Sequence, residues 1–89
     1  MSKIRYKVKA VLDTEKASKQ DASLKHALEY QNGRIYTIVD SDDTRTIDGQ
    51  QVPIGNSVEM DITNMVLRKN GYSSLRFDER PFYSVEVVN

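Results

Sequence analysis

The alternation of residues between Lys3 and Leu12 constrains the fold of this chain more than any other feature. Apolar residues recur at every second position, and lysine or arginine occupies most of the positions between them. Side chains of a β-strand point alternately to the two faces of its sheet, so a period of two predicts a strand with one apolar face. Such a sheet needs a second layer that covers the apolar face.

Residues 14–31 have the composition of a helix. They are mostly good helix formers, with no β-branched residue after Thr14, and either Asp13 or Thr14 can serve as the N-terminal cap. The Asn32-Gly33 pair that follows permits two interpretations. It ends this helix in a left-handed conformation, which we favour, or it forms a tight turn between two strands.

A second helix is predicted over residues 57–69. Apolar residues recur there at helical spacing, Asn56 begins a capping-box pattern, and Asn70-Gly71 provides a C-terminal cap. The competing interpretation is a short strand at the start of this stretch, with the helix beginning at Thr63.

The other segments read as strands. A tight turn is expected at Asp48-Gly49, and Pro53 confines any strand around it to an edge. The remaining strands are expected at residues 35–39, 45–54, 72–78 and 82–88. The sequence therefore predicts a single α+β domain over residues 1–89, a small two-layer sandwich with one or two helices on one face of a mainly antiparallel sheet. The order β-α-β-β-α-β plus a C-terminal strand also suggests a split βαβ arrangement, which would place the third strand centrally.

The sequence predicts no catalytic residue, metal site or cofactor. There is no cysteine, and the single histidine, His26, has no second ligand at a metal-binding spacing. A calcium loop beginning at Asp40 fails, because Arg45 stands where glycine is needed and Gln51 where glutamate is needed. The glycines are too scattered for a phosphate-binding loop. We therefore expect a protein that is not an enzyme.

The cations of the first strand are the first candidate site. Spaced two residues apart, they would form a row with steps of roughly 6.6 Å, close to the spacing of phosphates along a nucleic-acid strand. The candidate nucleic-acid-binding residues are Lys3, Arg5, Lys7 and Lys9. The alternative is that these residues only keep a solvent-facing or edge strand from aggregating, or pair with the acids of residues 40–61. No aromatic residue alternates with them, because Tyr6 belongs to the opposite face.

The second candidate site is a protein-binding surface. Charge is unevenly distributed: residues 1–34 carry eight cations and four acids, whereas residues 35–67 carry one cation and six acids. An acidic loop can imitate nucleic acid or neutralise a basic partner, and arginines beside aromatic residues often anchor interfaces. The candidate protein-binding residues are Asp40, Asp42, Asp43, Asp48, Arg76 and Arg80.

These features predict a non-enzymatic protein-binding module that acts as an inhibitor, adaptor or accessory subunit, of the kind that phages and other mobile elements carry. The alternatives are nucleic-acid binding through the first strand and a small-ligand sensor domain. No stretch approaches the roughly 20 apolar residues of a membrane-spanning helix, so we expect a cytoplasmic protein without a membrane partner. An edge strand and opposite charge blocks would permit a homo-oligomer.

Overall fold

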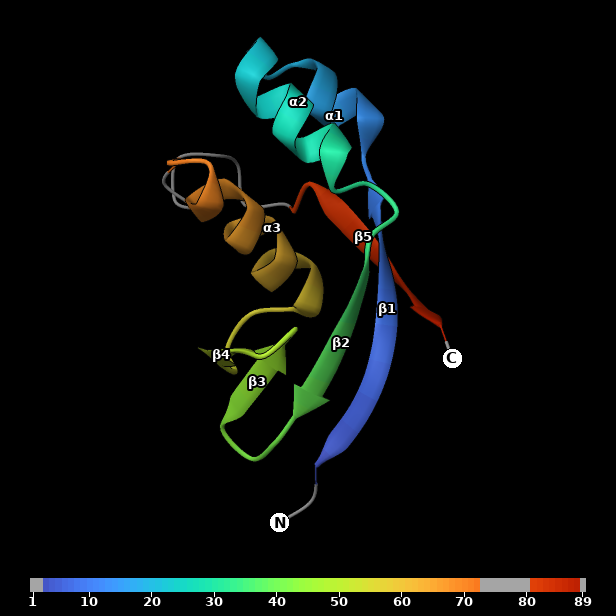
Figure 1. Ribbon diagram of the computed structural model, residues 1–89, viewed down its shortest axis with the longest axis vertical. Coiled ribbons are helices and arrows are strands. Elements are labelled where there is room, and N and C mark those ends of the chain that lie inside the picture. The colour runs from blue at the N-terminus through green and yellow to red at the C-terminus, as the bar shows by residue number, and fades with distance from the viewer. Residues whose placement is uncertain (1–2, 73–80, 89) are drawn as a thin grey trace.

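The computed structural model describes residues 3–72 and 81–88, which form a five-stranded antiparallel sheet with three helices (Figure 1). The strand order is β4-β3-β2-β1-β5, so the first strand lies inside the sheet, between β2 and β5, and not at an edge. The strands are β1 (Ile4–Leu12), β2 (Ile35–Asp40), β3 (Thr44–Ile47), β4 (Gln50–Pro53) and β5 (Tyr83–Val88). The helices are α1 (Thr14–Ser18), α2 (Ala22–Tyr30) and α3 (Val58–Lys69). The predicted α+β class is confirmed.

One face of the sheet is covered by the helices, and we call it the covered face. The alternation in β1 places Val8, Ala10 and Leu12 on this face, where all three are buried. Strand pairing sets Tyr36 of β2 opposite Val8 and Tyr83 of β5 opposite Leu12, and the helices add the other half of the core. The helical core residues are Ala17, Leu24, Leu28, Ile62, Met65, Val66 and Leu67.

The segment between β1 and β2 contains two short helices instead of the single helix predicted over residues 14–31. Helix α1 ends at Ser18, and Asp21 begins α2 by accepting a hydrogen bond from the backbone N–H of Leu24 at 2.8 Å. Aspartate is a poor residue inside a helix and a strong N-terminal cap, which explains the break. Figure 1 shows α1 and α2 side by side beyond one end of the sheet.

This break explains why the sheet does not have the split βαβ order. Residues 14–31 as one helix would span about 27 Å and carry the chain to the far end of β1, as a parallel neighbour requires. The chain instead returns to the end of β1 that it left. The backbone N–H of Gly33 donates to the carbonyl of Ala10 at 2.7 Å, and that of Ala10 donates to the carbonyl of Arg34 at 2.9 Å. Strand β2 therefore runs antiparallel beside β1.

Two of the predicted turns are found as expected. Gly33, with φ of 84°, stands between the end of α2 and β2, so Asn32-Gly33 ends a helix and is not a hairpin turn. Asp48 and Gly49 have φ of 48° and 85° and join β3 to β4, the pattern of a two-residue hairpin turn. Strand β4 is an edge strand that ends at Pro53.

The second helix begins one residue later than its capping pattern predicts. Ser57, and not Asn56, accepts the hydrogen bond from the backbone N–H of Met60, at 3.2 Å. Helix α3 then runs without a break to Lys69, so the alternative strand at its start is wrong. The strand predicted over residues 72–78 lies, except for Tyr72, outside the described residues. Within the described ranges, no helix is long and apolar enough to cross a membrane.

Candidate functional site

The second face of the sheet is covered by no described element, and we call it the open face. Pairing in register places the cations of β1 opposite β2 residues such as Ile35, which is 51% exposed. The open face consists of Arg5, Lys7, Lys9 and Val11 of β1, Ile35, Thr37 and Val39 of β2, Thr44 and Thr46 of β3, Gln51 and Pro53 of β4, and Ser84, Glu86 and Val88 of β5. It is a broad surface on which the interior strand β1 is basic.

The cations of β1 are brought together as the alternation predicts. Arg5, Lys7 and Lys9 share the open face, and Lys3 is exposed immediately before the strand. Lys9 Nζ lies 3.9 Å from Glu86 Oε2, and both side chains are largely exposed. None of the other three cations forms an ion pair with a described acid. The row therefore keeps most of its charge available to a partner.

A shallow hollow of about 510 Å³ lies at the middle of this row. It is lined by Arg5, Tyr6, Lys7, Thr37 and Val88. Two cations and a hydroxyl group are donors that suit a phosphate. The period of β1 indicated Arg5 and Lys7, but Thr37 and Val88 join them only because of the strand order, which the sequence did not reveal.

Asp40, one of the acids proposed to bind a protein, belongs to a buried charge network. Its two carboxylate oxygens accept hydrogen bonds from Arg45 Nε at 2.8 Å and from the Tyr6 hydroxyl at 3.0 Å. Arg45 Nη1 also donates to Asp61 Oδ2 at 3.0 Å and to the carbonyl of Asn56 at 2.9 Å. The network joins three strands to the start of α3. Its sequence signal was that Arg45 is the single cation among residues 35–67.

Burial dominates the electrostatics of this network. The exposed fractions of the Arg45 and Asp61 side chains are 11% and 6%. Burial raises the pKa of Asp61 above its usual range, and the lowering effect of the adjacent Arg45 does not cancel it. Burial by itself would lower the pKa of Arg45, but the hydrogen bonds to Asp40 and Asp61 outweigh it and raise this pKa. Burial, followed by the hydrogen bond to Asp40, raises the pKa of Tyr6.

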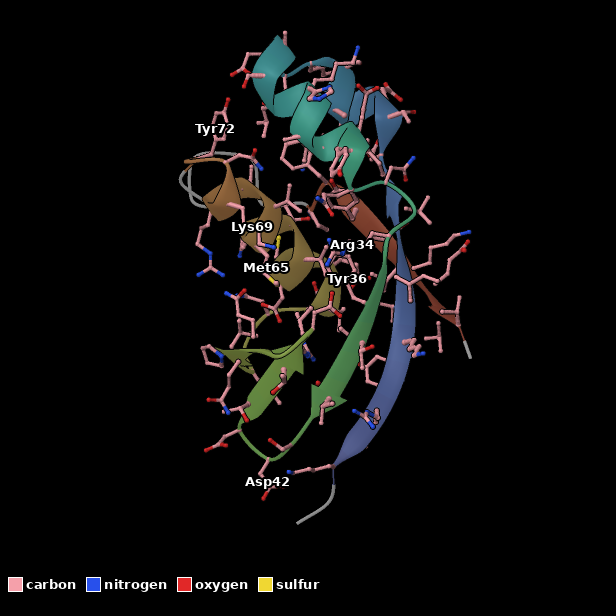
Figure 2. All side chains as sticks on the ribbon, viewed as in Figure 1. Arg34, Tyr36, Asp42, Met65, Lys69 and Tyr72 are labelled. Carbon is pink, nitrogen blue, oxygen red and sulfur yellow. The ribbon has the colours of Figure 1, made fainter. Side chains whose placement is uncertain are left out.

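The other candidate protein-binding residues do not form one surface. Asp48 Oδ1 accepts from the backbone N–H of Thr37 at 2.8 Å, and its second oxygen lies 3.2 Å from Arg34 Nη2, so Asp48 joins the turn between β3 and β4 to the start of β2. Asp42 and Asp43 are exposed at the turn between β2 and β3, and neither forms an ion pair with a described residue. Figure 2 shows Asp42 at the end of the molecule opposite α1 and α2. The last two candidates, Arg76 and Arg80, lie outside the described residues.

A larger hollow of about 670 Å³ lies beside α1 and the start of β5. Lys16 and Lys19 contribute positive charge to it, whereas Glu15 and Glu59 contribute negative charge, so its lining selects neither a cation nor an anion. Among residues 3–72 and 81–88, no group of three or more histidine, aspartate or glutamate side chains is placed to hold a metal ion.

Comparison of the chain with protein-family models, with curated proteins and with solved structures found no match. The proposals below therefore rest on the geometry and charge of the described residues.

Proposed function

We propose that this protein is a non-catalytic nucleic-acid-binding domain whose binding surface is the open face of the sheet. The observation that carries the proposal is a row of cations along an interior strand, on the face of the sheet that no described element covers. Glu86 is the one acid among the described residues that strand register places on this face. A surface with this excess of positive charge attracts the phosphates of a nucleic acid.

The position of β1 weakens the two alternative explanations of its charge. Lysines often protect the edge of a sheet from pairing with another chain, but β1 has a neighbour on each side. Pairing with the acids of residues 40–61 is not found either, because Asp40, Asp48 and Asp61 bind Arg45 or Arg34. Solvation of the open face would need polar residues, but not a row of one sign.

The first prediction is that replacing the two central cations abolishes most of the binding. Arg5→Gln with Lys7→Gln removes two charges at the hollow, and each lost phosphate contact should reduce the magnitude of the salt slope by about 0.9 for duplex DNA. Binding is measured by fluorescence anisotropy of labelled DNA and RNA, each single-stranded and double-stranded, over a series of salt concentrations.

The matched control is Lys19→Gln with Lys69→Gln, which removes the same charge from exposed positions of the helical layer. Its salt slope should stay close to that of the wild type. Equal losses in the two double variants would show that net charge, and not the open face, determines binding. Absence of binding to all four probes by the wild-type protein would refute the proposal.

Protein binding is a second candidate function. Two observations favour it: exposed aliphatic residues such as Ile35 lie on the open face, and Asp42 and Asp43 are exposed at the turn between β2 and β3. An inhibitor, adaptor or accessory subunit could use either surface. A protein partner retained after nuclease treatment, and lost on Asp42→Asn with Asp43→Asn but not on Arg5→Gln with Lys7→Gln, would favour this function. Both candidates fit the cytoplasmic location expected from the sequence.

A further inference from the structure

We propose that the nucleic acid bound by the open face is a double helix, which is contacted through its phosphates and without reading its sequence. This inference rests on the proposed function and specifies its partner. It follows from which side chains the open face contains and which it lacks.

Among the described residues, the open face has no aromatic side chain on which a single strand would stack. Proteins that bind single strands on a sheet usually stack unpaired bases on exposed aromatic rings. Here the tyrosines of the sheet all belong to the covered face: Tyr36 and Tyr83 are buried, and the Tyr6 hydroxyl is bonded to Asp40. The exposed Tyr30 belongs to α2.

Burial prevents Tyr36 and Tyr83 from turning outward, and the hydrogen bond to Asp40 holds the Tyr6 hydroxyl on the covered face. The Tyr83 hydroxyl donates to the carbonyl of Leu28 at 2.6 Å, which joins β5 to α2 across the core. Tyr36 packs in the same core, with the Arg34 guanidinium 5.1 Å from its ring centre (Figure 2). Exposing either ring would require the helices to separate from the sheet. A single strand would therefore gain only phosphate contacts, and its bases would have no aromatic ring on which to stack.

The groups that the open face does contain suit the outside of a duplex. Arg5 and Lys7 project from an interior strand around the hollow, and Thr37 adds a hydroxyl donor beside them. A double helix has its bases already stacked and paired, so it needs only phosphate contacts from the protein. The flanking side chains of β2, Ile35 and Val39, have no donor or acceptor with which to read a base edge. This composition around the hollow favours contacts with phosphates over contacts with base edges, so we expect sequence-independent binding.

The experiment compares a labelled mixed-sequence DNA duplex with each of its separated strands and with a second duplex of unrelated sequence, all against the full chain. We expect both duplexes to bind equally, with a Kd on the order of 10⁻⁴ to 10⁻⁶ M at physiological salt, and more tightly than either strand. The variant Arg5→Gln with Lys7→Gln should reduce the magnitude of the duplex salt slope by about 1.8. Unlabelled duplex should displace the probe better than polyglutamate at the same concentration of charge.

The possible failures are distinguishable. Tighter binding of the single strand, lost in the Arg5→Gln and Lys7→Gln variant, would overturn the duplex inference and leave the proposed function intact. A strong preference for one of the two duplexes would also overturn the inference, because it would require base contacts. Displacement by polyglutamate as effective as displacement by duplex would indicate an acidic protein partner and overturn both. Duplex binding that the double variant retains would assign it to another surface.

Discussion

Arg45 and Arg5 are the same residue type on opposite faces of one sheet, and their surroundings differ completely. Arg45, on the covered face, has two carboxylates within 3.0 Å and a side chain that is 11% exposed. Arg5, on the open face, is exposed and forms no ion pair with a described acid. Charged side chains in this protein therefore have two uses. On the covered face it joins elements of the fold, and on the open face it remains available for binding.

The difference follows from the cost of burying charge. A buried ion pair must recover the free energy of hydration that both groups lose, so each group needs several partners. Arg45 meets this requirement with Asp40, Asp61 and the carbonyl of Asn56. An exposed cation keeps its hydration and needs no partner. The presence of a partner therefore separates structural charges from charges that a ligand can use.

The largest effect expected from this comparison is that of Arg45→Ala. Removing the cation leaves Asp61 buried without a partner, and breaking a buried pair in this way costs about 3 to 5 kcal/mol. We expect a loss near the lower limit, because the Asp40 side chain is 23% exposed and can recover hydration. The free energy of unfolding in urea measures the loss.

Arg5→Ala is the matched control for Arg45→Ala. It removes the same side chain from the open face and should change the free energy of unfolding by no more than about 0.5 kcal/mol. Similar losses for the two variants would contradict the division into structural and available charges.

The two residues also show how much could be predicted from the sequence. The period of one strand is enough to predict that Arg5, Lys7 and Lys9 share a face. Local conformational preferences are enough to predict the turns at Gly33 and Gly49. The role of Arg45 cannot be predicted without the strand order, because Asp61 is distant in sequence and is brought to Arg45 by the packing of α3. The strand order in turn depends on the helix break at Asp21. This break was not predicted, because the residues around Asp21 have the composition of one continuous helix.

The next prediction concerns the pH dependence that Asp61 gives to stability. Its pKa is raised in the folded protein, chiefly by burial, from the ordinary value of 3.8. Between these two pKa values the folded state binds more protons at this site than the unfolded state does. The contribution of Asp61 to stability is therefore complete below pH 3.8 and is lost as the pH rises through the folded pKa.

The measurement is the difference in free energy of unfolding between the wild type and Asp61→Asn at a series of pH values. Asparagine has the same shape, can still accept from Arg45, and carries no charge at any pH. We expect the wild type to lose stability relative to the variant as the pH rises. Asp42→Asn controls for the loss of one negative charge at an exposed position. A relative gain with rising pH would mean that attraction to Arg45 outweighs burial.

A small effect on stability is also expected for Glu86→Gln, on the open face. Glu86 and Lys9 are 3.9 Å apart, and their side chains are 62% and 44% exposed, so their pairing should contribute less than about 1 kcal/mol. Binding should respond in the opposite direction from Arg5→Gln, because the substitution removes the acid from this face and frees Lys9. The magnitude of the duplex salt slope should rise by up to about 0.9.

Glu29→Gln removes the same charge from an exposed position of α2 and should leave the salt slope unchanged. Tighter binding without a change in stability would show that Glu86 weakens binding by pairing with Lys9, whereas Asp61, an acid on the other side of the sheet, affects the stability of the fold. Weaker duplex binding by Glu86→Gln would show the reverse, that the ion pair orients Lys9 for its ligand. In either case Glu86 acts through Lys9, whereas Asp61 acts through Arg45. Of the two acids, Asp61 should have the larger effect on the free energy of unfolding.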